Sequence, residues 1–160
     1  MKGIVMAALL AAALDAGAQQ AAKIGRVELG RPYAEAVEEI KGEFGEPAEA
    51  GETVVRYKDR SYKGVQFAEV AFVFRDGRLS EAKFSCKPEP RQAAVRRMAS
   101  IVKAWEGDYT ITEDVEDGGT PFYKGGSSPV GIGPLFTIYS MPGGGGQSAS
   151  LRYGPFRFRN

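Results

Sequence analysis

Two stretches of the chain share one spacing of apolar residues, in which successive members are four, three and four residues apart. Residues at these intervals lie on one face of an α-helix, because a helix completes a turn every ~3.6 residues. The pattern therefore predicts two amphipathic helices, each with one buried stripe. The first stripe consists of Tyr33, Val37, Ile40 and Phe44, and the second of Ala94, Met98, Ile101 and Trp105.

Proline and glycine mark the ends of both predicted helices. Pro32 precedes the first stripe and Gly45 follows it, while Pro88 and Pro90 precede the second stripe and Gly107 follows it. Proline fits a first helical turn because its missing N–H has no partner there, and glycine tolerates the backbone angles that end a helix. Each helix is therefore expected to stop before the β-prone residues that come next.

Runs rich in Val, Phe and Tyr follow each helix and predict antiparallel strands. The clearest hairpin joins residues 65–75 to residues 79–86 through Asp76 and Gly77, a residue pair typical of tight hairpin turns. Residues 118–146 are rich in glycine and proline and predict long loops. Further strands are predicted at residues 53–58, 109–115, 135–141 and 148–152, and residues 156–159 alternate in the way typical of an edge strand.

This order of elements predicts one α+β domain at residues 19–160, with a single antiparallel sheet. Each half contains a helix followed by three strands, so the chain is expected to form two αβββ-like halves. Both helices are expected to pack on one face of the sheet, because each has a single apolar stripe to bury. The opposite face of the sheet is then left available for contacts.

The N-terminal residues 1–18 have the three parts of a secretory signal peptide. Lys2 supplies the positive charge, residues 4–14 are apolar, and the small residues AGA at positions 16–18 offer a cleavage site. The apolar run is shorter than the ~20 residues that span a bilayer as a helix. We therefore expect export to the periplasm or the exterior and no membrane span. An uncleaved anchor is the alternative interpretation.

Composition excludes several function classes. The chain has 21 Lys and Arg against 20 Asp and Glu, which argues against nucleic acid as a partner. It has no histidine, the commonest general base and transition-metal ligand. Its one cysteine, Cys86, excludes an internal disulfide. We expect no catalytic residue, no metal and no cofactor.

Two groups of residues are candidates for catalysis or metal binding. A nucleophilic Cys86 needs a base or a strongly electropositive site, so a position at the end of a core strand is the favoured interpretation. Four clustered carboxylates are candidates for a Ca²⁺ loop or a glycosidase pair, but they lack the alternation of an EF-hand, and a solvated turn is favoured. These carboxylates belong to Glu113, Asp114, Glu116 and Asp117.

Three aromatic residues are the predicted binding residues: Tyr62, Phe122 and Tyr123. They are expected in polar or glycine- and proline-rich loops, where aromatic side chains often contact a partner. Packing against nearby residues of the same chain is the alternative.

Three stretches carry a resemblance to a known architecture: residues 30–45 (GRPYAEAVEEIKGEFG), residues 70–84 with the turn RDGRL, and residues 105–107 (WEG). In their order the chain resembles the β-lactamase inhibitory protein-like architecture, and it is similar to small exported proteins of Bacteroidetes-type bacteria that share it. The resemblance implies repeated helix-plus-hairpin units and a binding or inhibitory role at the open face of the sheet. The chain lacks the disulfides typical of the secreted inhibitor.

The predicted function is an exported, non-catalytic binding module. It is expected to contact a protein or an envelope component through the sheet face and the aromatic loops. One alternative is a hydrolase of envelope or dietary polymers that uses Asp and Glu, and another is a structural envelope protein or oligomer. Each of these predicts a different surface: an exposed apolar patch, a pocket with two carboxylates, or a large self-contact.

Overall fold

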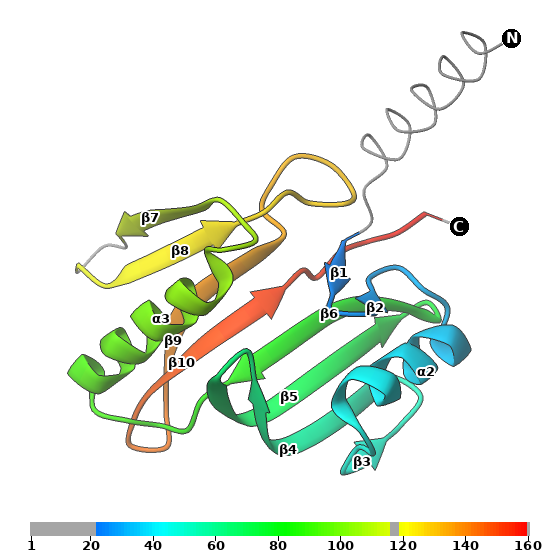
Figure 1. The fold of residues 1–160 in the computed structure, drawn as a ribbon, viewed down its shortest axis with the longest axis horizontal. Helices are drawn as coiled ribbons and strands as arrows, with labels where there is room; N and C mark the ends of the chain where they lie inside the picture. Colours follow the sequence, from blue (N-terminus) through cyan, green and yellow to red (C-terminus); the bar gives the residue numbers. More distant parts are fainter. Residues whose placement is uncertain (1–21, 116–118, 160) are drawn as a thin grey trace, which may run out of the picture.

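A computed structural model describes residues 22–115 and 119–159 of the chain; the predicted leader, residues 1–18, lies outside them. The main structural element is one antiparallel sheet of eight strands, in the order β3-β4-β5-β6-β10-β9-β8-β7 (Figure 1). A separate pair, β1 and β2, forms a small second sheet that was not predicted. In chain order the elements are β1 (Lys23–Ile24), β2 (Val27–Glu28), α2 (Tyr33–Phe44), β3 (Glu49–Ala50), β4 (Val54–Tyr62), β5 (Val65–Arg75), β6 (Arg78–Ser85), α3 (Arg91–Trp105), β7 (Ile111–Val115), β8 (Pro121–Gly125), β9 (Phe136–Gly143) and β10 (Gly146–Tyr153).

The sheet is built from two halves with the same order of elements. Helix α2 is followed by β3 to β6, and α3 is followed by β7 to β10. Each set of four strands forms an antiparallel meander, and the last strands of the two sets, β6 and β10, pair at the centre. We call this β6–β10 junction the seam. The predicted α+β class and helix-plus-hairpin repeat are confirmed, and each half has one strand more than expected.

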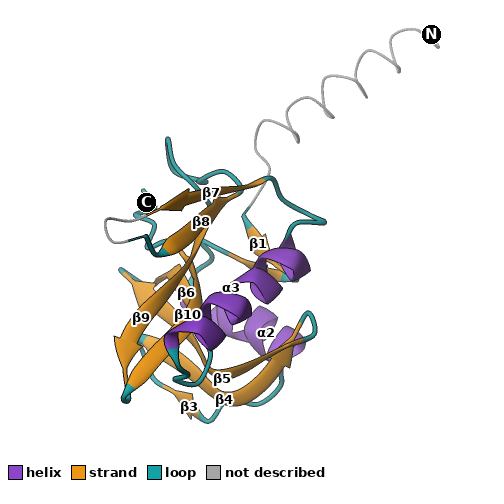
Figure 2. Cartoon of the chain, turned by 90° about the vertical axis from the view of Figure 1, so that its left-hand side faces the viewer, coloured by secondary structure: helices purple, strands orange, loops and turns teal. Residues whose placement is uncertain are grey.

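Both helices cover the same face of the sheet. The ring of Phe84 on β6 lies 6.0 Å from that of Phe44 at the end of α2, and 6.4 Å from that of Trp105 at the end of α3. A side chain leaves a sheet on one face only, so the two helices must share the face from which Phe84 projects. Figure 2 shows them side by side on that face. This confirms the predicted layering.

The helical stripes match the predicted ones closely. All four stripe residues of α3 are buried, whereas in α2 Ile40 and Phe44 are buried and Tyr33 and Val37 are only partly covered. Ala36, which the stripe did not include, is fully buried. Helix α2 packs against β2 as well as β6, so its buried face is turned slightly from the four-residue stripe.

Strand β4 is longer than predicted because the chain continues through a local bend. Asp59 has φ of +50°, a left-handed conformation that Asp tolerates better than most residues. Tyr57 faces the core before the bend, and Tyr62 faces it after the bend. The two residues are five positions apart, so the bend shifts the regular alternation of the strand by one residue. The bend brings Tyr62 and Phe67 to 6.0 Å and 6.3 Å from the Trp105 ring.

Two predictions about the second half are wrong. Pro121–Gly125 forms strand β8, where a loop was expected, because its backbone pairs with β7 and β9. Residues 156–159 do not form an edge strand. Gly154 has φ of +76° and turns the chain, after which one residue, Phe156, is held to β6 by hydrogen bonds with Ser80.

Candidate binding face

The sheet face opposite the helices, here called the uncovered face, carries residues that alternate with the core. Lys83 lies between Ala82 and Phe84, which are both fully buried, and Arg152 also lies between two buried residues. Because successive side chains of a strand point to opposite faces, Lys83 and Arg152 project from the uncovered face. Both residues lie within the two central strands of the sheet, so the strand backbone fixes the face from which each projects.

Two cations stand directly opposite each other at the seam. Lys83 of β6 and Arg152 of β10 are register partners. Like charges in directly opposed positions destabilise an antiparallel pair. Such a local conflict at the centre of a sheet indicates a role other than stability.

Arg152 has a compensating carboxylate, whereas Lys83 does not. Arg152 Nε donates to Glu81 Oε1 at 3.0 Å, and the Glu81 side chain is only 10% exposed. The Lys83 ammonium lies 3.8 Å from the sulfur of Met141. Among the described residues, no carboxylate is within ion-pairing distance of Lys83, so its charge is available to a partner.

The two central cations belong to a longer row. Strand register connects Arg56 on β4 through Ala71 to Lys83, and Arg152 through Thr137 to Lys124 on β8. With strands ~4.8 Å apart, this row spans about 24 Å from its first cation to its last. At the β4 end of the row, Arg56 forms ion pairs with two glutamates. Its Nη1 lies 3.2 Å from Glu49 Oε2, and its Nε lies 4.0 Å from Glu69 Oε1. We call Arg56, Lys83, Arg152 and Lys124 the basic row.

Apolar side chains flank the basic row in the second half. Tyr139 alternates with the buried Ile138 on β9, and Met141 on the same face is 44% exposed. Burial raises the pKa of Tyr139, while the nearby Arg152 opposes this shift. The Lys124 ammonium lies 5.5 Å from the ring centroid of Phe122. Aromatic and Met side chains beside Arg and Lys are typical of protein contact surfaces.

The three predicted binding residues are not brought together. Phe122 projects from the uncovered face, but Tyr123 pairs with Ile138 and packs against the core on the helix side. Tyr62 ends β4, and its ring lies 4.9 Å from that of Phe44. Their expected positions in loops are therefore wrong, and only Phe122 shares a face with the basic row. Burial raises the pKa of Tyr62 to about 12.

Of the residues considered for chemistry, Cys86 lies in the core, and Asp114, the register partner of Phe122, shares the uncovered face. Cys86 is buried, and this burial raises the pKa of its thiol to about 11, so it stays protonated near neutral pH. Glu113 and Asp114 are consecutive in β7 and point to opposite faces, while Glu116 and Asp117 lie outside the described residues. In the described ranges, no three His, Cys, Asp or Glu residues are grouped to hold a metal ion. Nor does either described helix have the length and apolarity for crossing a bilayer.

The sequence interpretation missed Lys83 and Arg152, although part of the signal was present. Each residue is a cation flanked by two apolar residues in a β-prone run, which places it on the outer face of its strand. What the pattern lacks is the pairing of β6 with β10, which makes the two cations neighbours.

Comparison with protein-family models, with curated proteins and with solved structures finds no match to this chain. The resemblance to the β-lactamase inhibitory protein-like architecture therefore stays a prediction from the sequence. An assignment of function has to come from the geometry of the uncovered face.

Proposed function

We propose that the protein is an exported, non-catalytic binding module whose uncovered face contacts an acidic protein or another anionic envelope component. Export is supported by the predicted leader, residues 1–18. The observation that carries the proposal is the pair of opposed cations, Lys83 and Arg152, at the seam of the sheet.

An anionic partner would remove the repulsion that this pair imposes on the free protein. Near a protein surface two unit charges ~4 Å apart interact by about 4 kcal/mol at an effective dielectric constant of ~20, so close like charges matter even in partial contact with water. The mostly buried Glu81 offsets Arg152 alone. A carboxylate or phosphate of the partner would supply the missing charge next to Lys83.

The extent of the basic row favours a macromolecular partner. Its cations lie on β4, β6, β10 and β8, so one small anion cannot reach them all. The neighbouring Tyr139 and Met141 offer apolar area that a partner could cover, with the cations at its rim. This arrangement supports specificity and fast association through charge complementarity, with apolar burial adding affinity.

A single substitution separates binding from stability. Lys83→Glu places opposite charges on β6 and β10, so the free energy of unfolding should stay equal or rise by about 0.5 kcal/mol. The same change should abolish attraction to an acidic partner. Lys103→Glu, on the exposed face of α3, changes the net charge equally and is the matched control.

The experiment compares capture by three immobilised proteins comprising residues 19–160: the wild type, Lys83→Glu and Lys103→Glu. An envelope extract of the producing cells is applied at low and at high salt, and retained components are identified by mass spectrometry. We expect a component retained by the wild type and the Lys103→Glu variant but not by Lys83→Glu, with retention lost at high salt. A component held equally by all three proteins, or none held by the wild type, would contradict the proposal.

A further inference from the structure

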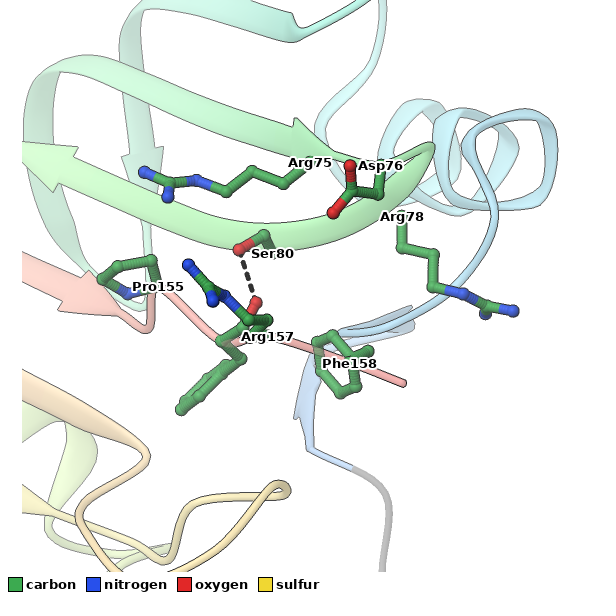
Figure 3. Close-up of a pocket in the computed structure, with 8 residues that line it drawn as sticks. Arg75, Asp76, Arg78, Ser80, Pro155, Arg157 and Phe158 are labelled. Carbon is green, nitrogen blue, oxygen red and sulfur yellow. Dashed lines mark hydrogen bonds between the residues drawn. The ribbon is translucent and has the colours of Figure 1, made fainter. Parts of the chain in front are cut away.

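A second polar feature lies where the β5–β6 turn approaches the segment after β10. The surface there has a hollow of about 570 Å³, within the size range of small-molecule sites (Figure 3). Its walls include Arg75, Asp76, Ser80, Pro155, Phe156 and Arg157. The first half of the chain supplies one side and the C-terminal segment supplies the other.

We propose that this hollow binds a small molecule through a phosphate or carboxylate group held between Arg75 and Arg157. In Figure 3 the guanidinium groups of both residues extend toward the side of the hollow where Pro155 lies. Within the described part of the chain, the side chains of Arg75 and Arg157 have no ion-pair or hydrogen-bond partner. Two arginines on one hollow therefore have donors to offer to a ligand.

The third arginine of the hollow has a different role. Arg78 Nη1 donates to the carbonyl oxygen of Gly30 at 2.9 Å, and Figure 3 shows its side chain turned away from the other two. Arg78 is thus part of the packing between β6 and the segment before α2. The proposal assigns it no ligand contact.

Hydrogen bonds hold the two sides of the hollow in place. Ser80 Oγ donates to the Phe156 carbonyl oxygen at 2.6 Å, and the Phe156 N–H donates to the Ser80 carbonyl oxygen at 2.8 Å. Arg157 follows directly, so its backbone is anchored to β6. Arg75 is the last residue of β5 and pairs with Arg78 across the hairpin turn. Donors on an ordered backbone bind with less loss of conformational entropy.

The chemistry of the walls defines the ligand class. Guanidinium groups match the oxygens of phosphate and carboxylate with two parallel hydrogen bonds, which a Lys ammonium cannot reproduce. Asp76 is the one carboxylate among the described residues that line the hollow, so the lining keeps a net positive charge. Phe156 and Phe158, whose ring centroids are 6.1 Å apart, form an apolar wall. An oxyanion attached to an apolar group fits these features.

The test is an NMR titration of ¹⁵N-labelled residues 19–160 with inorganic phosphate, phenyl phosphate, acetate and phenylacetate at constant ionic strength. We expect saturable shifts of the Gly77 and Arg157 amides and of the Arg side-chain Nε–H signals. The phenyl compounds should bind more tightly than phosphate or acetate. The phosphate and carboxylate arms show which oxyanion is preferred.

Variants separate a built site from general attraction of anions. Arg75→Ala and Arg157→Ala should each weaken binding about tenfold, the loss expected for one charge-assisted interaction. Arg157→Lys keeps the charge and should still weaken binding, whereas Arg159→Ala removes an equal charge two residues further on and should not. Lys83→Glu should leave these shifts unchanged, which distinguishes this site from the basic row.

Shifts that grow linearly without saturation would overturn the proposal. So would equal weakening by Arg159→Ala and Arg157→Ala, since that result indicates charge screening alone. The dispersion of each variant's spectrum shows that it is folded, so that a loss of binding is not mistaken for unfolding.

Discussion

The two halves of the sheet have the same order of elements but bury very different amounts of their strands. In β5 of the first half, six of the eleven residues are buried, whereas in β7 of the second half none is. The first half contributes most of the aromatic core, including Phe67, Phe72 and Phe84. The repeated order of elements thus sets the topology, while the side chains decide which half forms the core and which exposes its strands.

The two halves differ in burial, but their central hairpin turns have the same backbone geometry. The turn from β5 to β6 contains Asp76 and Gly77 with φ of +53° and +74°. The turn from β9 to β10 contains Gly144 and Gly145 with φ of +59° and +80°. Both are tight turns of the type that fits the twist of a hairpin. The halves therefore differ in packing rather than in connection, which the following substitutions test.

The largest difference is expected between two phenylalanines. Phe84→Ala removes the fully buried ring that contacts both helices and should lower the free energy of unfolding by about 3–5 kcal/mol. Phe122→Ala, on the uncovered face of β8, should cost about 0.5 kcal/mol or less. Urea unfolding followed by Trp105 fluorescence measures both. Equal losses would show that the second half shares the core equally.

A smaller difference is expected between two tyrosines that tie a strand to the end of a helix. In the second half the Tyr153 hydroxyl accepts a hydrogen bond from Trp105 Nε1 at 2.7 Å, and both groups are buried. Tyr153→Phe leaves that N–H without its acceptor and should cost about 1–3 kcal/mol.

In the first half the Tyr57 hydroxyl donates to the Gly45 carbonyl oxygen at 2.7 Å, in a partly buried position. Tyr57→Phe should cost only about 1 kcal/mol, because a partly buried carbonyl can turn to water. Thermal unfolding of Tyr153→Phe and Tyr57→Phe shows which variant loses more stability. A larger loss for Tyr57→Phe would reverse the comparison.

Replacing glycine by alanine should destabilise the β5–β6 turn and the β9–β10 turn by equal amounts. A methyl group at Gly77 or Gly145 meets no atom within 4 Å, so only the left-handed backbone conformation opposes it. Gly77→Ala and Gly145→Ala should each lower the free energy of unfolding by about 1 kcal/mol. Chemical denaturation gives both values, and a clear inequality would mean that the turns are not equivalent.

The last predicted effect is absent at neutral pH and is confined to alkaline pH. Burial raises the pKa of Tyr57 from its ordinary value of 10.0 to about 12. The unfolded state therefore ionises first as pH rises, so the stability due to this group is complete below pH 10 and is lost between pH 10 and 12. Tyr57→Phe should reduce the slope of the unfolding free energy in that range. Identical slopes for the variant and the wild type would contradict the assignment.

Local signals predicted most of the fold. The stripes of α2 and α3 and the Asp76-Gly77 turn depend on neighbours within a few residues, so they could be recognised from the chain alone. Strand β8 could not, because Pro121 and Gly125 favour a loop and only pairing with β7 and β9 makes them a strand. The sequence pattern predicts a loop position for Tyr62, because Asp is typical of the end of a strand and Asp59 precedes Tyr62. In the structure strand β4 continues through Asp59 and ends at Tyr62.

The candidate face was only half predictable. Alternation with buried neighbours assigns Lys83 and Arg152 each to an outer strand face. Their adjacency depends on the register between β6 and β10, two strands that are far apart in the sequence. Short-range patterns contain no information about such a register.

The position of β10 determines when the sheet can be completed. It is the last of the ten described strands to leave the ribosome, yet it lies between β6 and β9. In the described sheet β7, β8 and β9 connect to the earlier strands only through β10, so they have no template to join before it is made. The β3–β6 meander can assemble during synthesis, whereas closure of the eight-stranded sheet is a late, long-range step.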